Sequence, residues 1–173
     1  MQITEEYVRG FTEGEGCFTI GIKKKMSTGR PRGRPKKFSL LRSESTPHEL
    51  WQVFCVFRIS QTGLIGEQVL NEIKSLFGCG KVFVERKRKN PKWSPVYNFT
   101  VYAIEDHTSK IIPFFEAHTL LIKAEAYAIW KNAVMLLLTK QHGKENLEKL
   151  ISLKERLELV NSKKGKPYAP VQG

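Results

Sequence analysis

A glycine-rich stretch near the N-terminus, residues 7–18, constrains the fold of this chain more than any other segment. It reads Tyr-Val-Arg-Gly-Phe-Thr-Glu-Gly-Glu-Gly-Cys-Phe, which predicts a short helix that runs into a strand. Gly10 and Gly14 are four residues apart, so they lie on one helix face, where a second backbone can come close. Glu15 follows at the helix end. A close-packed pair of such helices, each ending in a carboxylate, suggests a two-fold metal site.

The charge of the chain indicates a polyanionic partner. The 29 Lys and Arg residues exceed the 17 Asp and Glu residues, which gives a net charge of +12. A field of this sign favours nucleic acid, and the basic residues gather in three clusters, within 23–37, 86–92 and 163–166. The sequence contains no run of about 18 apolar residues, so we expect no membrane span.

The cysteines and the N-terminus bear on the compartment. The 3 cysteines are widely spaced, which suits a reduced intracellular setting, and no pair has the spacing of a zinc site. The first residues are acidic and polar and do not have the pattern of a signal peptide.

Periodicity predicts one α+β domain over residues 1–160 and a basic tail over 161–173. Alternating apolar residues indicate strands, and apolar residues at helical spacing indicate helices. In chain order we expect a helix at 4–14, strands at 17–25 and 50–60, a helix at 64–77, strands at 80–86 and 95–103, a short helix from an Asp106 cap to about 117 broken by Pro113, and helices at 122–140 and 144–160. The four strands are expected to form one antiparallel sheet.

The segment 26–47 is rich in Gly, Pro, Ser and Arg and is predicted to be a long loop. Within it, Pro31-Arg32-Gly33-Arg34-Pro35 resembles the core of an AT-hook, which enters the minor groove of A·T-rich DNA. A flexible basic loop that touches phosphates is the alternative interpretation.

Three stretches together resemble one family. Residues 7–18 resemble the LAGLIDADG motif of homing endonucleases. Lys110-Ile111-Ile112-Pro113-Phe114-Phe115-Glu116, followed by Leu120-Leu121-Ile122-Lys123, and the strand end Phe57-Arg58-Ile59-Ser60-Gln61 are also similar to family segments. The predicted order αββαββα is that of the LAGLIDADG fold, with further helices at the C-terminus. The motif occurs once, and the resemblance is therefore to the single-motif, homodimeric type.

The resemblance implies a site-specific endonuclease that hydrolyses both strands of a long, near-palindromic DNA site and leaves short 3′ overhangs. It implies a divalent cation, Mg²⁺ or else Mn²⁺ or Ca²⁺, held by Glu15 and by the backbone carbonyl of Gly14. Glu15 stands where the usual residue is Asp, and Glu13 takes the earlier, lesser acidic position. Gln61 matches a residue that positions solvent, and Lys123 matches the lysine of the water network or scissile phosphate.

The sheet is expected to read DNA, because a twisted antiparallel ribbon fits the major groove. Arg58 and Lys23 are the best candidates to read guanine, and Gln52 and Asn98 could read adenine. The predicted DNA-binding set comprises Thr19, Lys23, Lys25, Arg30, Arg32, Arg34, Gln52, Phe54, Arg58, Lys81, Phe83, Glu85, Lys87, Asn98, Thr100 and Lys163. The predicted dimer interface comprises Val8, Gly10, Phe11 and Gly14.

Two other functions remain open at this point. One is an intron RNA maturase of the same fold that no longer cuts DNA. The other is a non-enzymatic DNA binder that uses the basic loop 28–37. Family members are usually encoded in self-splicing introns, so the resemblance implies an intracellular protein of an organelle or of a prokaryotic or archaeal cytoplasm.

Overall fold

The computed structural model describes residues 3–25, 50–85, 94–139 and 144–163. The elements, in chain order, are α1 (Glu5–Glu15), β1 (Gly16–Lys25), β2 (Leu50–Thr62), α2 (Gly63–Phe77), β3 (Lys81–Val84), β4 (Val96–Val101), α3 (Ile104–Asp106), the π-helical turn η1 (His107–Ile111), α4 (Ile112–Ala117), α5 (Ala124–Leu138) and α6 (Lys144–Lys163). The predicted mixed fold with one four-stranded antiparallel sheet is confirmed, and the strand order is β1-β2-β4-β3.

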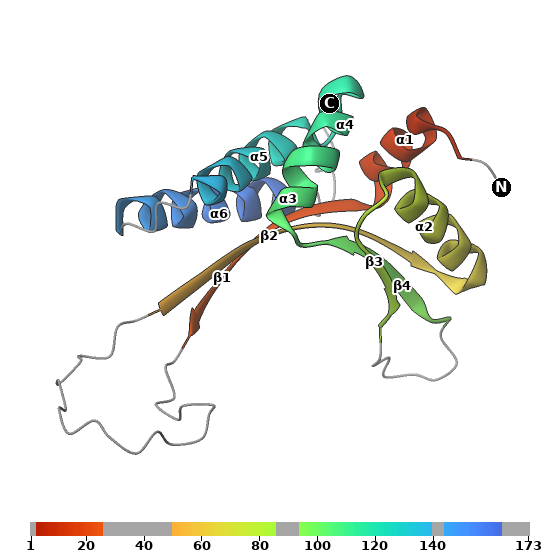
Figure 1. Ribbon diagram of the computed structural model, residues 1–173, viewed down its shortest axis with the longest axis horizontal. Coiled ribbons are helices and arrows are strands. Elements are labelled where there is room, and N and C mark those ends of the chain that lie inside the picture. Colours follow the sequence, from red (N-terminus) through yellow and green to blue (C-terminus); the bar gives the residue numbers. More distant parts are fainter. Residues whose placement is uncertain (1–2, 26–49, 86–93, 140–143, 164–173) are drawn as a thin grey trace, which may run out of the picture.

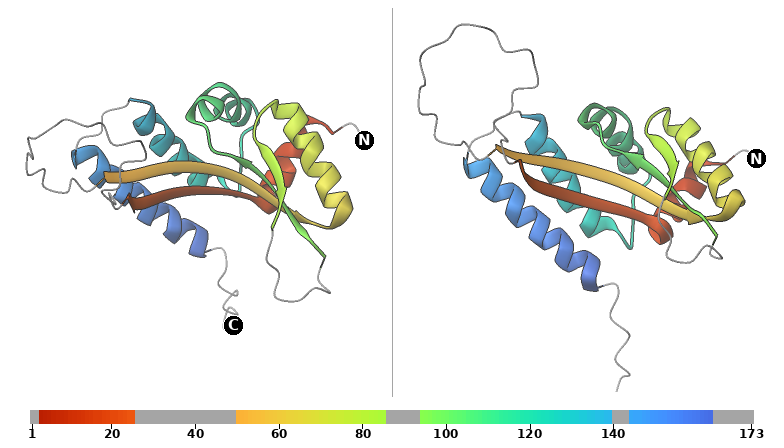
Figure 2. Two further views of the ribbon diagram at one scale, coloured as in Figure 1. Left: turned by 60° about the horizontal axis from the view of Figure 1, so that its bottom comes forward. Right: turned by 90° about the horizontal axis from the view of Figure 1, so that it is seen from below.

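The sheet is an arch with helices on one side only (Figure 1). Helices α1 and α2 cover the end near β3 and β4, and α5 and α6 cover the end near β1 and β2 (Figure 2). The long β1–β2 ribbon descends on one side of the arch, and β3 and β4 descend on the other side. Among the described residues, no helix lies on the concave face of the sheet.

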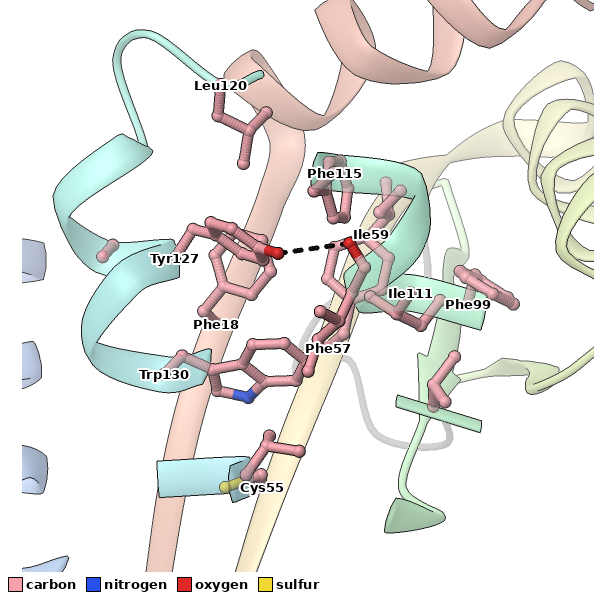
Figure 3. Packing of buried hydrophobic residues seen from close by; sticks show 14 of the residues in the cluster. Phe18, Cys55, Phe57, Ile59, Phe99, Ile111, Phe115, Leu120, Tyr127 and Trp130 are labelled. Atoms are coloured by element: carbon pink, nitrogen blue, oxygen red, sulfur yellow. Dashed lines mark hydrogen bonds between the residues drawn. The ribbon is translucent and has the colours of Figure 1, made fainter. Parts of the chain in front are cut away.

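Alternation along the strands separates a dry face from the concave face. Phe18 pairs with Phe57, and Phe57 pairs with Val101, so these three side chains point together toward the helices. Phe18 packs on Phe57 with ring centroids 5.2 Å apart and on Trp130 of α5 at 5.1 Å (Figure 3). Complete burial of such a side chain contributes about 1.5–3 kcal/mol. This aromatic layer fixes the sheet face that remains outside.

Helix α1 is capped at both ends. The hydroxyl of Thr4 accepts the backbone N–H of Tyr7 at 3.2 Å, and the N–H of Gly16 bonds to the carbonyl of Thr12. Val8 and Thr12 are fully buried. A Cβ at Gly16 would lie 2.6 Å from the Thr12 side chain, so only glycine allows the chain to pass this closely from α1 into β1.

Two local predictions for residues 104–117 are wrong. Asp106 does not cap a helix: the N-cap is Ala103, and Asp106 has helical backbone angles with its carboxylate 3.8 Å from Lys110 Nζ. Pro113 does not break the helix, because it stands in the first turn of α4, where a backbone N–H is not needed. The π turn before it carries the wider N–H bond from Ile112 to the His107 carbonyl.

Helix α6 extends to Lys163, which lies within the predicted tail.

The π turn buries an imidazole. His107 is fully buried, its Nε2 lies 3.1 Å from the carbonyl oxygen of Cys55, and its ring meets Trp130 edge-on at 4.8 Å. Its Nδ1 has no hydrogen-bond partner in the described part of the chain. Burial lowers the pKa of His107, although the Cys55 carbonyl and the Asp106 charge act in the opposite direction.

We therefore expect acid to weaken this fold through His107. The folded pKa is below the unfolded value of about 6.5, so the stability is present above that pH and is lost as pH falls below it, by about 1.4 kcal/mol per pKa unit of difference. Urea unfolding at pH 7 and pH 5 measures the decline. His107→Gln keeps an N–H donor for Cys55 and should remove this part of it; an undiminished decline in the variant would contradict the assignment.

Candidate functional site

The C-terminal end of α1 is joined to the segment before α5 by the carboxylate of Glu13. Its Oε2 accepts the backbone N–H of Lys123 at 3.0 Å, and its Oε1 accepts those of Leu121 and, at 3.3 Å, Ile122. One side chain thus satisfies three successive backbone N–H groups in the segment that leads into α5, the last of them that of the N-cap residue Lys123. The effect is that α1 and α5 are fixed to each other close to the glycine-rich junction.

The side chain of Lys123 binds the α1–β1 junction in turn. Its Nζ donates to the carbonyl oxygens of Thr12 at 3.0 Å and Gly14 at 3.1 Å, and to that of Gly16. These carbonyls lie at the negative end of the α1 dipole, which favours a cation. The ammonium therefore sits in a cradle of backbone oxygens at the α1–β1 junction, which we call the carbonyl cradle (Thr12, Gly14 and Gly16).

Glu15, the last residue of α1, lies exposed beside the carbonyl cradle. Gln61 is half-buried near the end of β2, two residues past Ile59, which is the register partner of Gly16. Its side chain faces the helix side of the sheet, packs on Gly66 and accepts the N–H of Thr62 at 3.4 Å. The structure brings the Gly14 carbonyl and the Lys123 ammonium together, with Glu15 the next residue of the chain, and it places Gln61 at the same end of the sheet.

The oxygen atoms at this junction suit a hard divalent cation. A carboxylate and backbone carbonyls are the ligands that Mg²⁺ and Ca²⁺ prefer. The carbonyl cradle already holds one cation, the Lys123 ammonium, so the backbone oxygens are oriented to bind positive charge. Within the described ranges, no group of three His, Cys, Asp or Glu side chains is placed to hold a metal ion.

The outer face of α1 is open. An ideal Cβ built at Gly10 or Gly14 meets no described atom within 4 Å. On one side of these glycines Phe11 stacks on Tyr7 at 5.5 Å, and on the other side Glu13 holds Leu121, whose side chain is 77% exposed. Of the predicted dimer-interface residues, Val8 is fully buried on the inner face of α1, whereas Gly10, Phe11 and Gly14 lie partly or wholly at the surface.

The concave face of the sheet carries most of the predicted DNA-binding residues. Strand register places Arg58 beside Cys17 and Thr100, and Lys23 beside Gln52. The exposed members of the predicted set on this face are Thr19, Lys23, Gln52, Arg58, Lys81, Phe83 and Glu85. In β1 and β2 the side chains of the opposite parity, Phe18, Phe57 and Ile59, are buried on the helix side of the sheet.

Phe54 lies flat on this face instead of standing up from it. A Cβ at its register partner Gly21 would come within 2.1 Å of the Phe54 ring, so the ring covers the glycine backbone directly. The ammonium of Lys23 lies 5.2 Å from the ring centroid on the same face, in cation–π geometry. The absence of a side chain at Gly21 therefore allows the Phe54 ring to lie against the sheet. The alternation of residue types along the strand did not reveal this role.

Two predicted base readers are covered. Asn98 is 6% exposed and Thr100 is 1% exposed, because β4 lies between β2 and β3 and longer side chains flank it. Asn98 Oδ1 accepts the Ser60 hydroxyl at 2.7 Å. Their role as base readers stays a prediction. Arg30, Arg32, Arg34 and Lys87, with the loop 28–37, lie outside the described residues, and only the backbone is described for Lys25 and Lys163.

Comparison with known proteins assigns the family. The sequence model of the family described as LAGLIDADG endonuclease matches residues 8–134. The match covers well over half of the chain and includes the α1–β1 junction, Gln61 and Lys123. The chain therefore belongs to the LAGLIDADG endonuclease family.

Solved structures of the same fold agree. The homing endonuclease I-TnaI superposes with a TM-score of 0.64 at 24% identity, over 94% of this chain and 99% of that one. I-LtrWI bound to target DNA gives 0.67 at 27% identity, over 89% of this chain and 44% of its own. I-SmaMI, bound to uncleaved DNA in the presence of calcium ions, gives 0.65 at 22% identity, over 99% and 53%. The chain thus spans about half the length of the last two; a comparison with curated proteins gives no match.

Glu13 should matter for stability and Glu15 should not. Glu13→Gln weakens charge-assisted hydrogen bonds to three backbone N–H groups, so we expect the free energy of unfolding to fall by about 1–3 kcal/mol. Glu15→Gln, two residues later and exposed, is the matched control and should change it little. Urea unfolding of both variants measures the difference. Equal stability of the two would mean that the Glu13 contacts do not hold the junction.

Proposed function

We propose that this protein is a homodimeric, Mg²⁺-dependent, site-specific DNA endonuclease. The observation that carries the proposal is the α1–β1 junction, where an exposed carboxylate (Glu15), an oriented carbonyl (Gly14) and an ammonium (Lys123) meet at the end of a helix with an open glycine face. The family membership and the DNA-bound relatives I-LtrWI and I-SmaMI support DNA as the substrate.

The α1 surface supports a homodimer. Gly10 and Gly14 leave room for a second backbone, and the exposed side chains of Leu121 and Ile122, at 77% and 69%, offer apolar surface beside them. A two-fold axis along the glycine face would bring two Glu15 carboxylates together. The relatives in which this chain covers 44% and 53% of the length have room for two such units in one chain, which supports a pair as the working unit.

The chain's own residues divide the work of phosphodiester hydrolysis. Glu15 and the Gly14 carbonyl would hold Mg²⁺, which lowers the pKa of bound water and neutralises phosphate charge. Gln61 would orient the attacking water. Lys123 would place a positive charge next to the phosphate that is cut. The two concave faces of the dimer, with Arg58, Lys23 and Lys81 exposed, would hold the DNA on either side of the cut.

The test is a cleavage selection. The purified protein is incubated with a DNA library that contains the nucleotide sequence flanking its gene, with Mg²⁺ and with EDTA. We expect double-strand cuts with 3′ overhangs at one near-palindromic site, and only with the metal. Tight binding to that site with no cleavage under any divalent cation would leave a non-catalytic nucleic-acid binder, such as a maturase, as the better assignment.

A further inference from the structure

The ammonium of Lys123 can donate only three hydrogen bonds at a time. A lysine ammonium has three donors and no acceptor. In this structure three carbonyl oxygens of the carbonyl cradle lie within hydrogen-bond distance of Nζ. Lys123 therefore cannot donate to a phosphate or to a catalytic water with full strength until it releases at least one of these carbonyls.

The carbonyl of Gly14 has two candidate partners, the Lys123 ammonium and the proposed metal ion. Gly14 accepts from Lys123 at 3.1 Å, and the same oxygen is the proposed metal ligand. Magnesium binds oxygen at about 2.1 Å, so a metal on Gly14 and an unmoved ammonium would be at most about 5 Å apart. Two cations at that separation repel each other strongly in a site of reduced dielectric.

We propose that Lys123 is the resident cation of the carbonyl cradle in the metal-free protein and that its ammonium leaves the Gly14 carbonyl when a divalent cation binds there. The proposal rests on the proposed function, because it takes Gly14 and Glu15 as the metal ligands. Lys123 then has two successive roles. It first neutralises the carbonyls at the end of α1, and it afterwards has a free donor beside the bound metal.

Glu13 keeps the released ammonium close. The backbone N–H of Lys123 is bonded to Glu13 Oε2 at 3.0 Å, independently of the side-chain contacts. The side chain can therefore swing away from Gly14 while its Cα stays anchored to the end of α1. Metal binding would thus leave the Lys123 ammonium close to the metal with a free donor. Before the metal binds, the same ammonium occupies the Gly14 carbonyl and competes weakly with the metal for it.

Metal affinity measured without DNA tests the displacement. Binding of Mn²⁺ to the full chain is followed by the loss of the free Mn²⁺ signal in electron paramagnetic resonance, for the wild type and for Lys123→Met, which keeps most of the stem but not the charge. We expect Lys123→Met to bind Mn²⁺ about tenfold more tightly or better, about 1.4 kcal/mol, because no ammonium competes for Gly14. The gain should disappear in Lys123→Met/Glu15→Gln.

Lys110 provides a matched control. Its Nζ also donates to a carbonyl at the end of a helix, that of Gly78 after α2, where no metal is proposed. Lys110→Met should leave the Mn²⁺ affinity unchanged. In the wild type, competitive acylation of lysines should show Lys123 becoming several-fold more reactive when Mn²⁺ is added at saturating concentration, with Lys110 unaffected; this second readout needs no variant to fold.

The outcomes separate the inference from the function on which it rests. Unchanged or weaker Mn²⁺ binding by Lys123→Met, together with unchanged Lys123 reactivity in the wild type, overturns the displacement and leaves Glu15 as a metal ligand. A tenfold gain that survives Glu15→Gln places the Mn²⁺ away from Glu15 and overturns both the displacement and the proposed metal site.

Discussion

Glu15→Gln is expected to reduce DNA cleavage about a thousandfold or more while leaving the fold and DNA binding in place. The carboxylate would supply the negative charge that holds the divalent cation, and the metal's effect on the water and the phosphate is worth several kcal/mol, of which about 4 kcal/mol corresponds to a thousandfold. The amide is nearly isosteric but neutral. Single-turnover cleavage of the cognate site in Mg²⁺ measures the loss.

The position of Glu15 makes this a clean experiment. The side chain is exposed at the C-terminal end of α1, where the helix dipole disfavours a negative charge. Neutralising it should therefore cost no stability, and binding to DNA measured in EDTA should not weaken, because a negative charge near phosphate is removed. Glu155→Gln, the same change on the exposed surface of α6, is the control for cleavage. Wild-type cleavage by Glu15→Gln would remove Glu15 from the metal site.

Sequence alone predicted the fold because its main signals are local. Glycines at the ends of α1 and α2, alternation in the strands and apolar spacing in α2 and α5 each set one element, and the structure confirms their order. The errors lie where local signals compete. Asp106 has the residue type of a cap, yet the helix starts earlier, at Ile104, and Pro113 is accommodated because it stands in the first turn of α4.

The site was predictable only in part, because its contacts are distant in sequence. Glu13 and Lys123 are 110 residues apart, so no local spacing predicts their contacts. The Glu13 carboxylate accepts the backbone N–H of Lys123 before α5, and the Lys123 ammonium donates to the backbone carbonyl of Thr12 near the end of α1. The role of Gly21 was not predictable from the sequence, since only strand register shows that Phe54 rests on it. Burial of Asn98 and Thr100 likewise depends on β4 being an inner strand, and the sheet order is not written in the residues of β4.

In the proposed homodimer, Gly10→Gln is expected to disrupt the contact between the two α1 helices, to leave a monomer and to abolish double-strand cleavage. In the protomer a Cβ at Gly10 meets no described atom within 4 Å, so the substitution causes no clash there. Glycine is a poor helix former, and its replacement should even stabilise the isolated α1 by roughly 0.5 kcal/mol. In a dimer that packs α1 on α1, the same side chain would stand where the partner backbone must be.

The two interpretations of the glycine face therefore predict opposite results. If α1 faces solvent, Gly10→Gln leaves the sedimentation coefficient and cleavage unchanged and raises the unfolding midpoint slightly. If α1 is the dimer interface, the variant sediments as a monomer at concentrations where the wild type is a dimer, its unfolding midpoint no longer depends on protein concentration, and cleavage of both strands is lost. Ala128→Gln introduces the same side chain at an exposed position of α5, and it should keep the wild-type mass and cleavage. Because Glu15, the proposed metal ligand, lies one residue beyond Gly14 on the same helix, loss of the proposed dimer would separate the two carboxylates, and loss of cleavage should follow loss of the dimer in proportion.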